Sequence, residues 1–548
     1  MNKIKRVLSI FLAVSLVILS FSGCSSDSER LDIIYPFSGD IRSFDPQVAS
    51  TADEFLIAEN CFEGLVRVSD DGTVMPAAAE KWSISEDGKT YTFYLQKGLK
   101  WHIGEDSKAE EVFGVGDGPD ITANDFVFAL QRTASKNTDA PLFSSISNIV
   151  NASEIHSGKK KASQLGVKAV DDYTLQITLK SADNSFIKVL ATAAAMPCNE
   201  QFFNATNGRY GLGIDYSLFN GQFYLSSILE SSYILKSNSQ YTGINKTQVT
   251  DITLKIADES ADIPKNLKSG YYDAAYISGQ EYHQLKDSGI TATGYADTTT
   301  ALILNKNKII FSQKELRQAV CLSISEIDLT DREYLSRATG FTPPSCTIGE
   351  QSAPDAIGNI NPKQDIEKAQ ELWKSGLERL GISTADLTVI VTEEYEDVAK
   401  ELVQGIQKGI GQISSYGIDD TPVSFSLKIE VLSQADFSTA FANGDYDLAL
   451  YSFSASSQSA LNFLDSIING NYAGTVSDAQ TALKKAQSSS ADKLAGAVKS
   501  CEKALMADYS IKPVFYESSY YAQAKGVSGI QFHPGSGRVC FVNAQREK

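Results

Sequence analysis

The segment from Glu63 to Trp101 constrains the fold of this chain more than any other part of the sequence. Two turn dipeptides, Asp71-Gly72 and Asp87-Gly88, interrupt it, and glycine accepts the positive φ angles that tight turns require. After the second turn apolar and polar residues alternate, with Tyr91 and Phe93 on one side. A period of two residues is typical of a strand with one buried face. The segment therefore predicts three short strands joined by tight turns.

The segment and the residue after it contain a fixed order of residues: Glu63-Gly64-Leu65, Asp71-Gly72, Pro76, Ala79-Glu80, Trp82, Asp87-Gly88-Lys89, Tyr91, Phe93, Leu95, Lys100, Trp101 and His102. This order resembles a signature of the family 5 extracellular solute-binding proteins, which supply peptide and nickel ABC importers. The resemblance implies an α/β fold with two lobes, of the periplasmic-binding-protein type II, in the large peptide-binding variant that has an extra subdomain. Because the signature covers strands and turns, it predicts the fold and says little about the ligand.

The first 23 residues are typical of a lipoprotein signal peptide. A basic start precedes the apolar run 7–21, which is shorter than the roughly 20 residues that a membrane-spanning helix needs. We expect cleavage before Cys24, a diacylglycerol on its thiol, and a flexible tether over 24–30. An ordinary signal peptide with a chance cysteine is the alternative. Both kinds of signal predict export. The lipid on Cys24 would hold the protein at the outer face of the cytoplasmic membrane.

Further similarities along the chain predict its division into lobes. Residues 31–64, 197–300 and 509–548 are expected to form lobe I, with 65–196 as its extra subdomain, and 301–508 are expected to form lobe II. Strands and helices alternate in the last range, which implies parallel strands joined by right-handed crossovers. The resemblance implies that the ligand binds in a cleft between the lobes, where closure would bury it.

Residues 104–120 depart from the family pattern, which passes quickly from the Trp-His step to the next helix. Three glycines lie in this stretch, but their spacing is not that of a phosphate-binding loop and no strand precedes them. We therefore expect a surface insertion. The pattern resumes at Thr122, which together with Asp125 is predicted to cap a helix.

The chain is acidic, with a formal net charge of −18 at pH 7. This charge argues against nucleic acid as a partner and against direct adhesion to anionic lipid. The four histidines are scattered without metal-ligand spacing, so we expect no metal and no cofactor. An exported protein could pair its cysteines, but a chain of this size does not need disulfides, so we expect buried free thiols. Apart from Cys24 the cysteines are Cys61, Cys198, Cys321, Cys346, Cys501 and Cys540.

The stretch 453–464 resembles the family's Trp-x-Ala-Asp-Tyr-x-Asp-Pro-x-x-Phe-Leu segment. In peptide-binding relatives the first of these acids is expected to bind the α-amine of the peptide, a strong interaction once water is excluded. Here the register holds, but Phe453 replaces the tryptophan, and Ser456 and Ser459 replace the two acids. The usual anchor for an amine is therefore missing.

Two explanations for the missing anchor remain open. The ligand could lack a cationic N-terminus and bind through hydroxyl groups beside aromatic residues. Alternatively, Asp53 or Glu517 could supply the charge. The serines could also belong to a plain surface loop. The candidate ligand-binding residues by alignment are Ser50, Phe143, Asn305, Tyr451, Phe453, Ser456 and Tyr516.

The sequence thus predicts a lipid-anchored, monomeric receptor that captures a peptide or peptide-like solute and delivers it to the membrane permease of an ABC importer. A receptor of the same fold for a non-peptide ligand, or a peptide sensor, is the alternative. A secreted hydrolase is a remote one, because it would need a nucleophile with a base, or paired carboxylates. No Gly-x-Ser-x-Gly or His-centred motif is present, so we expect no catalytic residues and no enzyme activity.

Overall fold

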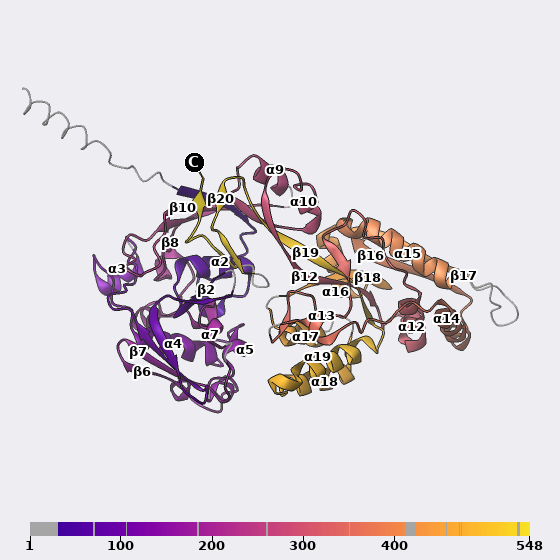
Figure 1. Cartoon of the computed structure of the whole chain (residues 1–548), viewed down its shortest axis with the longest axis horizontal. Helices are drawn as coiled ribbons and strands as arrows, with labels where there is room; N and C mark the ends of the chain where they lie inside the picture. The colour runs from indigo at the N-terminus through magenta and orange to yellow at the C-terminus, as the bar shows by residue number, and fades with distance from the viewer. Residues whose placement is uncertain are drawn as a thin grey trace, which may run out of the picture. The chain divides into compact units, whose positions relative to one another are not determined.

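The computed structural model describes residues 31–547 except 70–71, 106, 184–185, 259–260, 350, 412–423, 456–457, 471, 473 and 534–537 (Figure 1). The chain divides into two compact units. Unit 1 holds the described residues up to Ala261, then Gly526–Gln531 and the residues from Val539 onward; unit 2 holds Asp262–Lys525 and Phe532–Arg538. Residues 262–300 and 509–525 thus group with unit 2, although the resemblance assigns them to lobe I. The lobe boundaries themselves stay a prediction.

The first sheet of unit 1 has four strands in the order β1-β10-β9-β8. The first two strands are parallel, and the other neighbours are antiparallel. Helix α2 (Ala52–Cys61) packs against β8, and its capping box is formed by Thr51 and Glu54. Asn60 on this helix also bonds the backbone of Val539 and Phe541, which ties the C-terminal segment to unit 1. The strands are β1 (Leu31–Phe37), β8 (Phe223–Leu229), β9 (Ser232–Ser237) and β10 (Val249–Ile256).

The second sheet of unit 1, in the order β4-β5-β7-β6, contains the second half of the segment 63–101. Tyr91, Phe93 and Leu95 on β5 are buried, as their spacing predicts. The segment contains four strands rather than three, because β2 and β3 form a separate hairpin. The strands are β2 (Val66–Val68), β3 (Val74–Pro76), β4 (Ala79–Ile84), β5 (Thr90–Leu95), β6 (Val167–Asp171) and β7 (Thr174–Thr178).

Helix α4 (Ala123–Ala134) covers β6 and β7. The predicted cap at its start is confirmed, because the backbone N–H of Thr122 donates to Asp125 Oδ2 at 2.7 Å. Phe126, Ala129 and Leu130 form its buried face. Such an amphipathic helix gains its stability from packing on the sheet more than from intrinsic propensity.

Unit 2 is built on one seven-stranded sheet with the order β11-β19-β12-β18-β16-β17, in which β13 adds to β19. Strands β16 and β17 are parallel and α15 joins them, so the predicted strand–helix–strand unit is confirmed. The two long strands β12 and β19 run antiparallel at the centre. The strands are β11 (Ala274–Ile277), β12 (Thr291–Leu304), β13 (Leu335–Arg337), β16 (Thr384–Thr392), β17 (Ser424–Leu432), β18 (Leu448–Ser454) and β19 (Ile511–Gln523).

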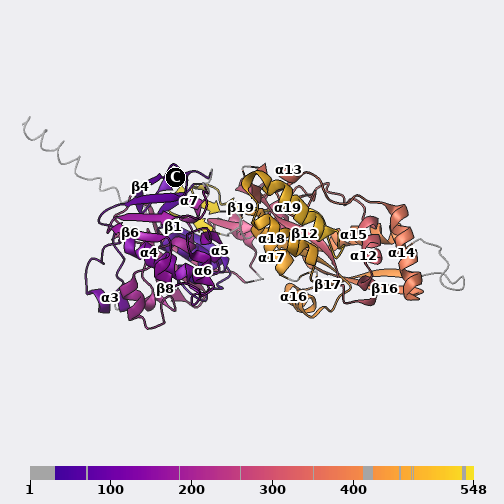
Figure 2. The same ribbon diagram turned by 90° about the horizontal axis from the view of Figure 1, so that it is seen from below.

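Helices cover both faces of this sheet, and Figure 2 shows α18 and α19 side by side on one of them. Leu448 and Leu450 contribute to one core, whereas Ala449 and Phe453 contribute to the other. Burial on both faces is typical of α/β proteins. The first core includes α12 (Lys314–Ser323), α14 (Ile366–Leu380) and α15 (Glu396–Ile410); the second includes α13 (Ala353–Ile357), α16 (Gln434–Asn443), α17 (Ala460–Asn469), α18 (Ser477–Gln487) and α19 (Ala491–Met506).

One helix of unit 2 starts later than its sequence suggests. A start at Asn361-Pro362 is expected, but α14 begins at Ile366, and Asp365 caps it by accepting from the Lys368 N–H at 3.0 Å. The Asn361 amide instead donates to the carbonyl oxygens of Ala338 and Pro513, at 2.8 and 3.0 Å. Tertiary hydrogen bonds have therefore overridden the local helix-start signal.

The six described cysteines are buried and free, as expected from the sequence. Burial raises the pKa of Cys198, Cys321, Cys346 and Cys501 to about 12, which keeps these thiols protonated and unreactive. Within the described part of the chain, no helix is both long enough and apolar enough to cross a membrane.

Candidate functional site

Three central strands of unit 2 place polar side chains in a row across one face of the sheet. Thr298 on β12 is in register with Ser454 on β18 and with Glu517 on β19. Adjacent strands lie about 4.8 Å apart, so the row from Glu517 to Ser454 spans about 10 Å. The hydroxyl oxygens of Thr298 and Ser454 are 2.9 Å apart. The row therefore joins a carboxylate to the end of β18, the position where relatives are expected to bind an amine.

A second row of hydroxyl groups lies beside the first. Thr300 Oγ1 and Ser452 Oγ are 2.8 Å apart, and Ser452 Oγ donates to the hydroxyl of Tyr395 at 2.9 Å. Tyr395 ends the short helix η5 (Glu393–Tyr395), and its hydroxyl donates to Glu517 Oε2 at 2.6 Å. We call Thr298, Thr300, Tyr395, Ser452, Ser454 and Glu517 the strand-end network.

Glu517 is the ionisable centre of the strand-end network, and its side chain is 5% exposed. Burial raises its pKa to about 7, with the carboxylates of Glu394 and Asp297 adding to the rise and the hydrogen bond from Tyr395 opposing it. Among the described residues, no lysine, arginine or histidine forms an ion pair with Glu517. A cation that approached would favour the charged form and pull the pKa down.

A second buried carboxylate, Asp297, lies next to this network. It accepts hydrogen bonds from the hydroxyls of Tyr276 and Ser519, at 2.7 and 3.2 Å, and from Thr298 at 3.1 Å. Its backbone carbonyl accepts from the N–H of Ala455 at 2.8 Å, at the end of β18. Burial raises its pKa as well. Sequence reasoning missed Asp297; the signal was a run of four polar residues that precedes the apolar end of β12.

The opposite face of the sheet carries three of the predicted site residues. Tyr451 and Phe453 on β18 have ring centroids 4.8 Å apart, and Tyr516 lies on the same side, in the row of Thr299 and Phe453. The hydroxyl of Tyr516 accepts from the N–H of Gly340 at 3.0 Å. Phe453 and Tyr516 are buried, whereas Tyr451 is half-buried. The aromatic cluster also includes Phe341, Phe437, Phe441, Tyr446, Phe463 and Tyr472.

The other predicted residues are not members of the strand-end network. Asn305 follows the far end of β12, and its amide donates to the backbone oxygens of Gly444 and Tyr446 at 3.1 and 3.0 Å. Ser50 is exposed in unit 1, and Phe143 in unit 1 stacks on a histidine ring with centroids 3.7 Å apart.

Of the two serines that replace the family's acids, the structure describes only Ser459. Ser456 lies outside the described residues, so its place in the site stays a prediction. Ser459 is the N-cap residue of α17, and its hydroxyl accepts from the N–H of Asn462 at 3.2 Å. A helix-capping serine satisfies an otherwise unpaired backbone N–H group. Ser459 therefore has a structural role that explains its presence.

Comparison with known proteins places the chain in a family. Residues 73–474 match the family described as bacterial extracellular solute-binding proteins, family 5 Middle. The chain belongs to this family. As a family 5 solute-binding protein it is 24% identical over 573 aligned positions to the dipeptide-binding protein of Lactococcus lactis subsp. cremoris, with 96% of each chain covered. It is 27% identical over 320 positions to the probable deoxycholate-binding periplasmic protein YgiS of Escherichia coli, covering 57% of this chain and 56% of that one.

The fold of this family 5 protein also has solved counterparts. The structure of Listeria monocytogenes OppA bound to peptide aligns with a TM-score of 0.72 at 23% identity, covering 95% of this chain and 100% of that one. The likeness confirms the predicted two-lobed periplasmic-binding-protein fold. Extracellular solute-binding proteins of this family bind their solutes without chemical change.

Proposed function

We propose that this protein captures a peptide or peptide-like solute outside the cytoplasmic membrane and delivers it to the permease of an ABC importer. Its family membership supports the proposal, and so does its full-length similarity to a dipeptide-binding protein. The protein acts without catalysis, and a lipid on Cys24 holds it at the membrane surface. Sensing of a peptide without transport uses the same binding step.

The strand-end network supports a particular type of ligand, one with a positively charged group. A buried carboxylate that accepts a hydrogen bond from one tyrosine hydroxyl, and has no described cationic partner, is costly to ionise unless a cation joins it. Glu517 is such a group, and it lies in the same row as Ser454, the last residue of β18, the strand after which the family's acid has been lost. We assign to Glu517 the attraction of the ligand's ammonium group, with Ser452 and Ser454 as neutral hydrogen-bond partners.

Asp53, the other acid considered from the sequence, is a weaker candidate. Its Oδ2 atom accepts from the Ser38 hydroxyl at 2.7 Å and from the backbone N–H groups of Gly39 and Asp40 at 2.7 and 3.1 Å. These three donors hold the loop before α2 in place. Asp53 therefore already has a structural role within unit 1.

A peptide with a free amine is expected to stabilise the protein. At one hundred times its Kd, trialanine should raise the free energy of unfolding by about 2.7 kcal/mol. N-acetyl-trialanine should bind at least about tenfold more weakly, because it cannot form the charge-assisted bond to Glu517. Thermal unfolding with each peptide, together with isothermal titration calorimetry, measures both effects.

Two matched variants show which acid binds the ligand's amine. Glu517→Gln should remove the preference for the free amine, whereas Asp53→Asn should leave it unchanged. Equal binding of both peptides by the unmodified protein would instead favour a blocked, cyclic or non-peptide ligand. The similarity to a probable deoxycholate-binding protein makes a non-peptide solute the second candidate. If neither peptide nor deoxycholate raises the unfolding temperature, the proposed function loses its support.

A further inference from the structure

The insertion 104–120 is a folded element of unit 1. Its two ends are joined, because the Trp101 N–H donates to the Pro119 carbonyl at 3.1 Å and Lys100 pairs with Asp120 at 2.6 Å. Gly118 passes so close to Trp101 that a Cβ atom there would lie 1.8 Å from the Trp101 carbonyl oxygen. Only glycine fits such an approach. The base of the insertion is therefore fixed in place.

The body of the insertion contains helix α3 (Lys108–Phe113), whose N-cap residue is Ser107. The Ser107 hydroxyl accepts from the Glu110 N–H at 3.2 Å and donates to the Gly104 carbonyl at 2.6 Å. Phe113 at the end of the helix stacks on Phe202, with ring centroids 6.4 Å apart. The insertion thus forms a wall that stands beside the edge strand β8.

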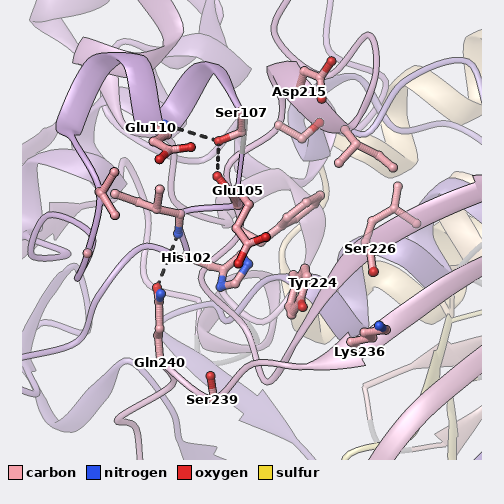
Figure 3. Close-up of a pocket in the computed structure, with 18 residues that line it drawn as sticks. His102, Glu105, Ser107, Glu110, Asp215, Tyr224, Ser226, Lys236, Ser239 and Gln240 are labelled. Atoms are coloured by element: carbon pink, nitrogen blue, oxygen red, sulfur yellow. Dashed lines mark hydrogen bonds between the residues drawn. The ribbon is translucent and has the colours of Figure 1, made fainter.

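A cavity of about 630 Å³ lies between this wall and strands β8 and β9 (Figure 3). Its volume is within the range of small-molecule sites, roughly 300–1,000 Å³. All of its lining residues belong to unit 1. The residues of the strand-end network, by contrast, belong to unit 2. The residues that the argument uses are His102, Glu105, Tyr224, Ser226 and Ser239.

His102 presents a neutral ring with a free acceptor to this cavity. Asn238 Oδ1 accepts from the Gln240 N–H at 3.0 Å and its Nδ2 donates to Gly221, so its amide orientation is settled. His102 Nδ1, 3.2 Å from that oxygen, must therefore carry the proton, which leaves Nε2 as an acceptor. Burial lowers the pKa of His102 to about 4, so the ring is uncharged at neutral pH. Its Nε2 atom has no partner among the described residues.

The charged groups that line the cavity are Glu105, Glu110, Asp215 and Lys236, so their net charge is negative and favours a cation, and several hydroxyl groups lie among them. The carboxylate of Glu105 has no described hydrogen-bond or ion-pair partner, and Figure 3 shows it pointing toward the His102 ring. His102 stacks on Tyr224 with centroids 3.9 Å apart, which offers an aromatic surface to a flat ring or a cation. The hydroxyls of Tyr224, Ser226 and Ser239 also have no described partner. Three free hydroxyls, a ring acceptor and a carboxylate are complementary to an amine that carries hydroxyl groups.

We propose that this cavity is a second ligand site, which binds a small hydroxylated amine of the size of an amino sugar. The ammonium group would lie between Glu105 and the aromatic pair of His102 and Tyr224. The ligand's hydroxyls would bond His102 Nε2, Ser226 and Ser239. Such a ligand uses the charge, the acceptor and the hydroxyls together, whereas a neutral sugar would leave the Glu105 carboxylate unpaired.

Isothermal titration calorimetry of the full mature chain with glucosamine tests this proposal. Glucosamine should bind, and N-acetylglucosamine, which keeps the ring but lacks the charge, should bind at least about tenfold more weakly. Glu105→Gln should weaken glucosamine binding to a similar extent. Glu86→Gln, at an exposed hairpin position away from the cavity, is the matched control and should change nothing.

Two further measurements keep the result interpretable. Ser239→Phe should abolish glucosamine binding, because it fills the cavity. Both cavity variants should keep the unfolding temperature of the parent and its response to trialanine, which shows that they are folded and that unit 2 is unaffected. No heat of binding up to the solubility limit of glucosamine would overturn the proposal. Equal binding by Glu105→Gln, or by N-acetylglucosamine, would overturn it as well.

Discussion

Replacement of Asp45 by asparagine is expected to lower the free energy of unfolding by about 3–5 kcal/mol, the usual loss when one partner of a buried ion pair is removed. Asp45 is 4% exposed and Arg132, its partner on α4, is 8% exposed. Arg132 Nη1 donates to Asp45 Oδ1 at 3.0 Å, and Nη2 donates to Oδ2. The variant leaves the guanidinium buried without a counter-charge.

The surroundings of Arg132 offer no replacement for that charge. Its Nη1 atom also donates to Gln47 Oε1 at 2.6 Å, and its guanidinium lies over the rings of Phe203 and Tyr210, 4.3 and 5.3 Å from their centroids. These contacts orient the group but carry no full negative charge. Asp45 therefore supplies the negative charge that balances the buried guanidinium, and its carboxylate raises the pKa of Arg132.

Urea unfolding of Asp45→Asn and of a control variant measures this effect. Asp120→Asn breaks the pair with Lys100, in which both side chains are partly exposed, at 31% and 44%. Such pairs contribute at most about 1 kcal/mol. Similar losses in the two variants would mean that the pair of Asp45 and Arg132 does not hold α4 against the loop before α2. Hydrogen exchange of the α4 amides provides a local check.

Glu517→Gln is expected to stabilise the protein at pH 8 by about 3 kcal/mol. The pKa of Glu517 is about 7 in the folded protein, compared with an ordinary value of 4.5. Each unit of pKa difference between the folded and unfolded states corresponds to about 1.4 kcal/mol. Burial causes most of the shift, and Glu394 and Asp297 add to it, so the carboxylate is costly to ionise in the fold.

The direction of the pH dependence follows from which state keeps the proton. Between pH 4.5 and 7 the folded protein holds a proton that the unfolded chain has released. The stability associated with Glu517 is therefore complete below pH 4.5 and is lost as the pH rises through 7. Glutamine imitates the protonated form and removes this loss. The two proteins should be equally stable near pH 4 and should diverge as the pH rises.

The free energies of unfolding of the parent protein and of Glu517→Gln are measured from pH 4 to pH 8. Their difference reports on Glu517, because other buried acids such as Asp125 are common to both proteins. Glu315→Gln serves as the control. Glu315 is paired with Arg379 on the surface, which lowers its pKa, so its contribution does not change between pH 6 and pH 8. A constant difference for Glu517→Gln over the whole range would contradict the assigned pKa.

Much of the fold could be predicted from the sequence because local patterns and tertiary packing agree. The alternation around Tyr91 and Phe93 follows the buried face of β5, and Thr122 and Asp125 cap α4 as expected. Where the two disagree, packing prevails: the amide of Asn361 bonds two distant carbonyls, and α14 starts later for that reason. Position-specific hydrogen bonds of this kind leave no periodic signal in a sequence.

The candidate site was harder to predict, because its members come from segments far apart in the chain. The sequence could flag Glu517 as an unassigned acid, but Tyr395, which bonds it, lies more than one hundred residues earlier and belongs to no motif. Ser459 resembles a lost ligand contact, yet it caps a helix. The register of β12 with β18 and β19 is what assembles the network, and a single sequence does not contain that register.

Native mass spectrometry of the soluble chain beginning at Ser25, purified gently and then denatured, tests the binding of peptide most directly. The proposed function predicts short peptides with free N-termini among the released compounds. It also predicts that their amount falls when Glu517→Gln is purified in the same way. Release of a single non-peptide compound, with no peptide from either protein, would contradict it.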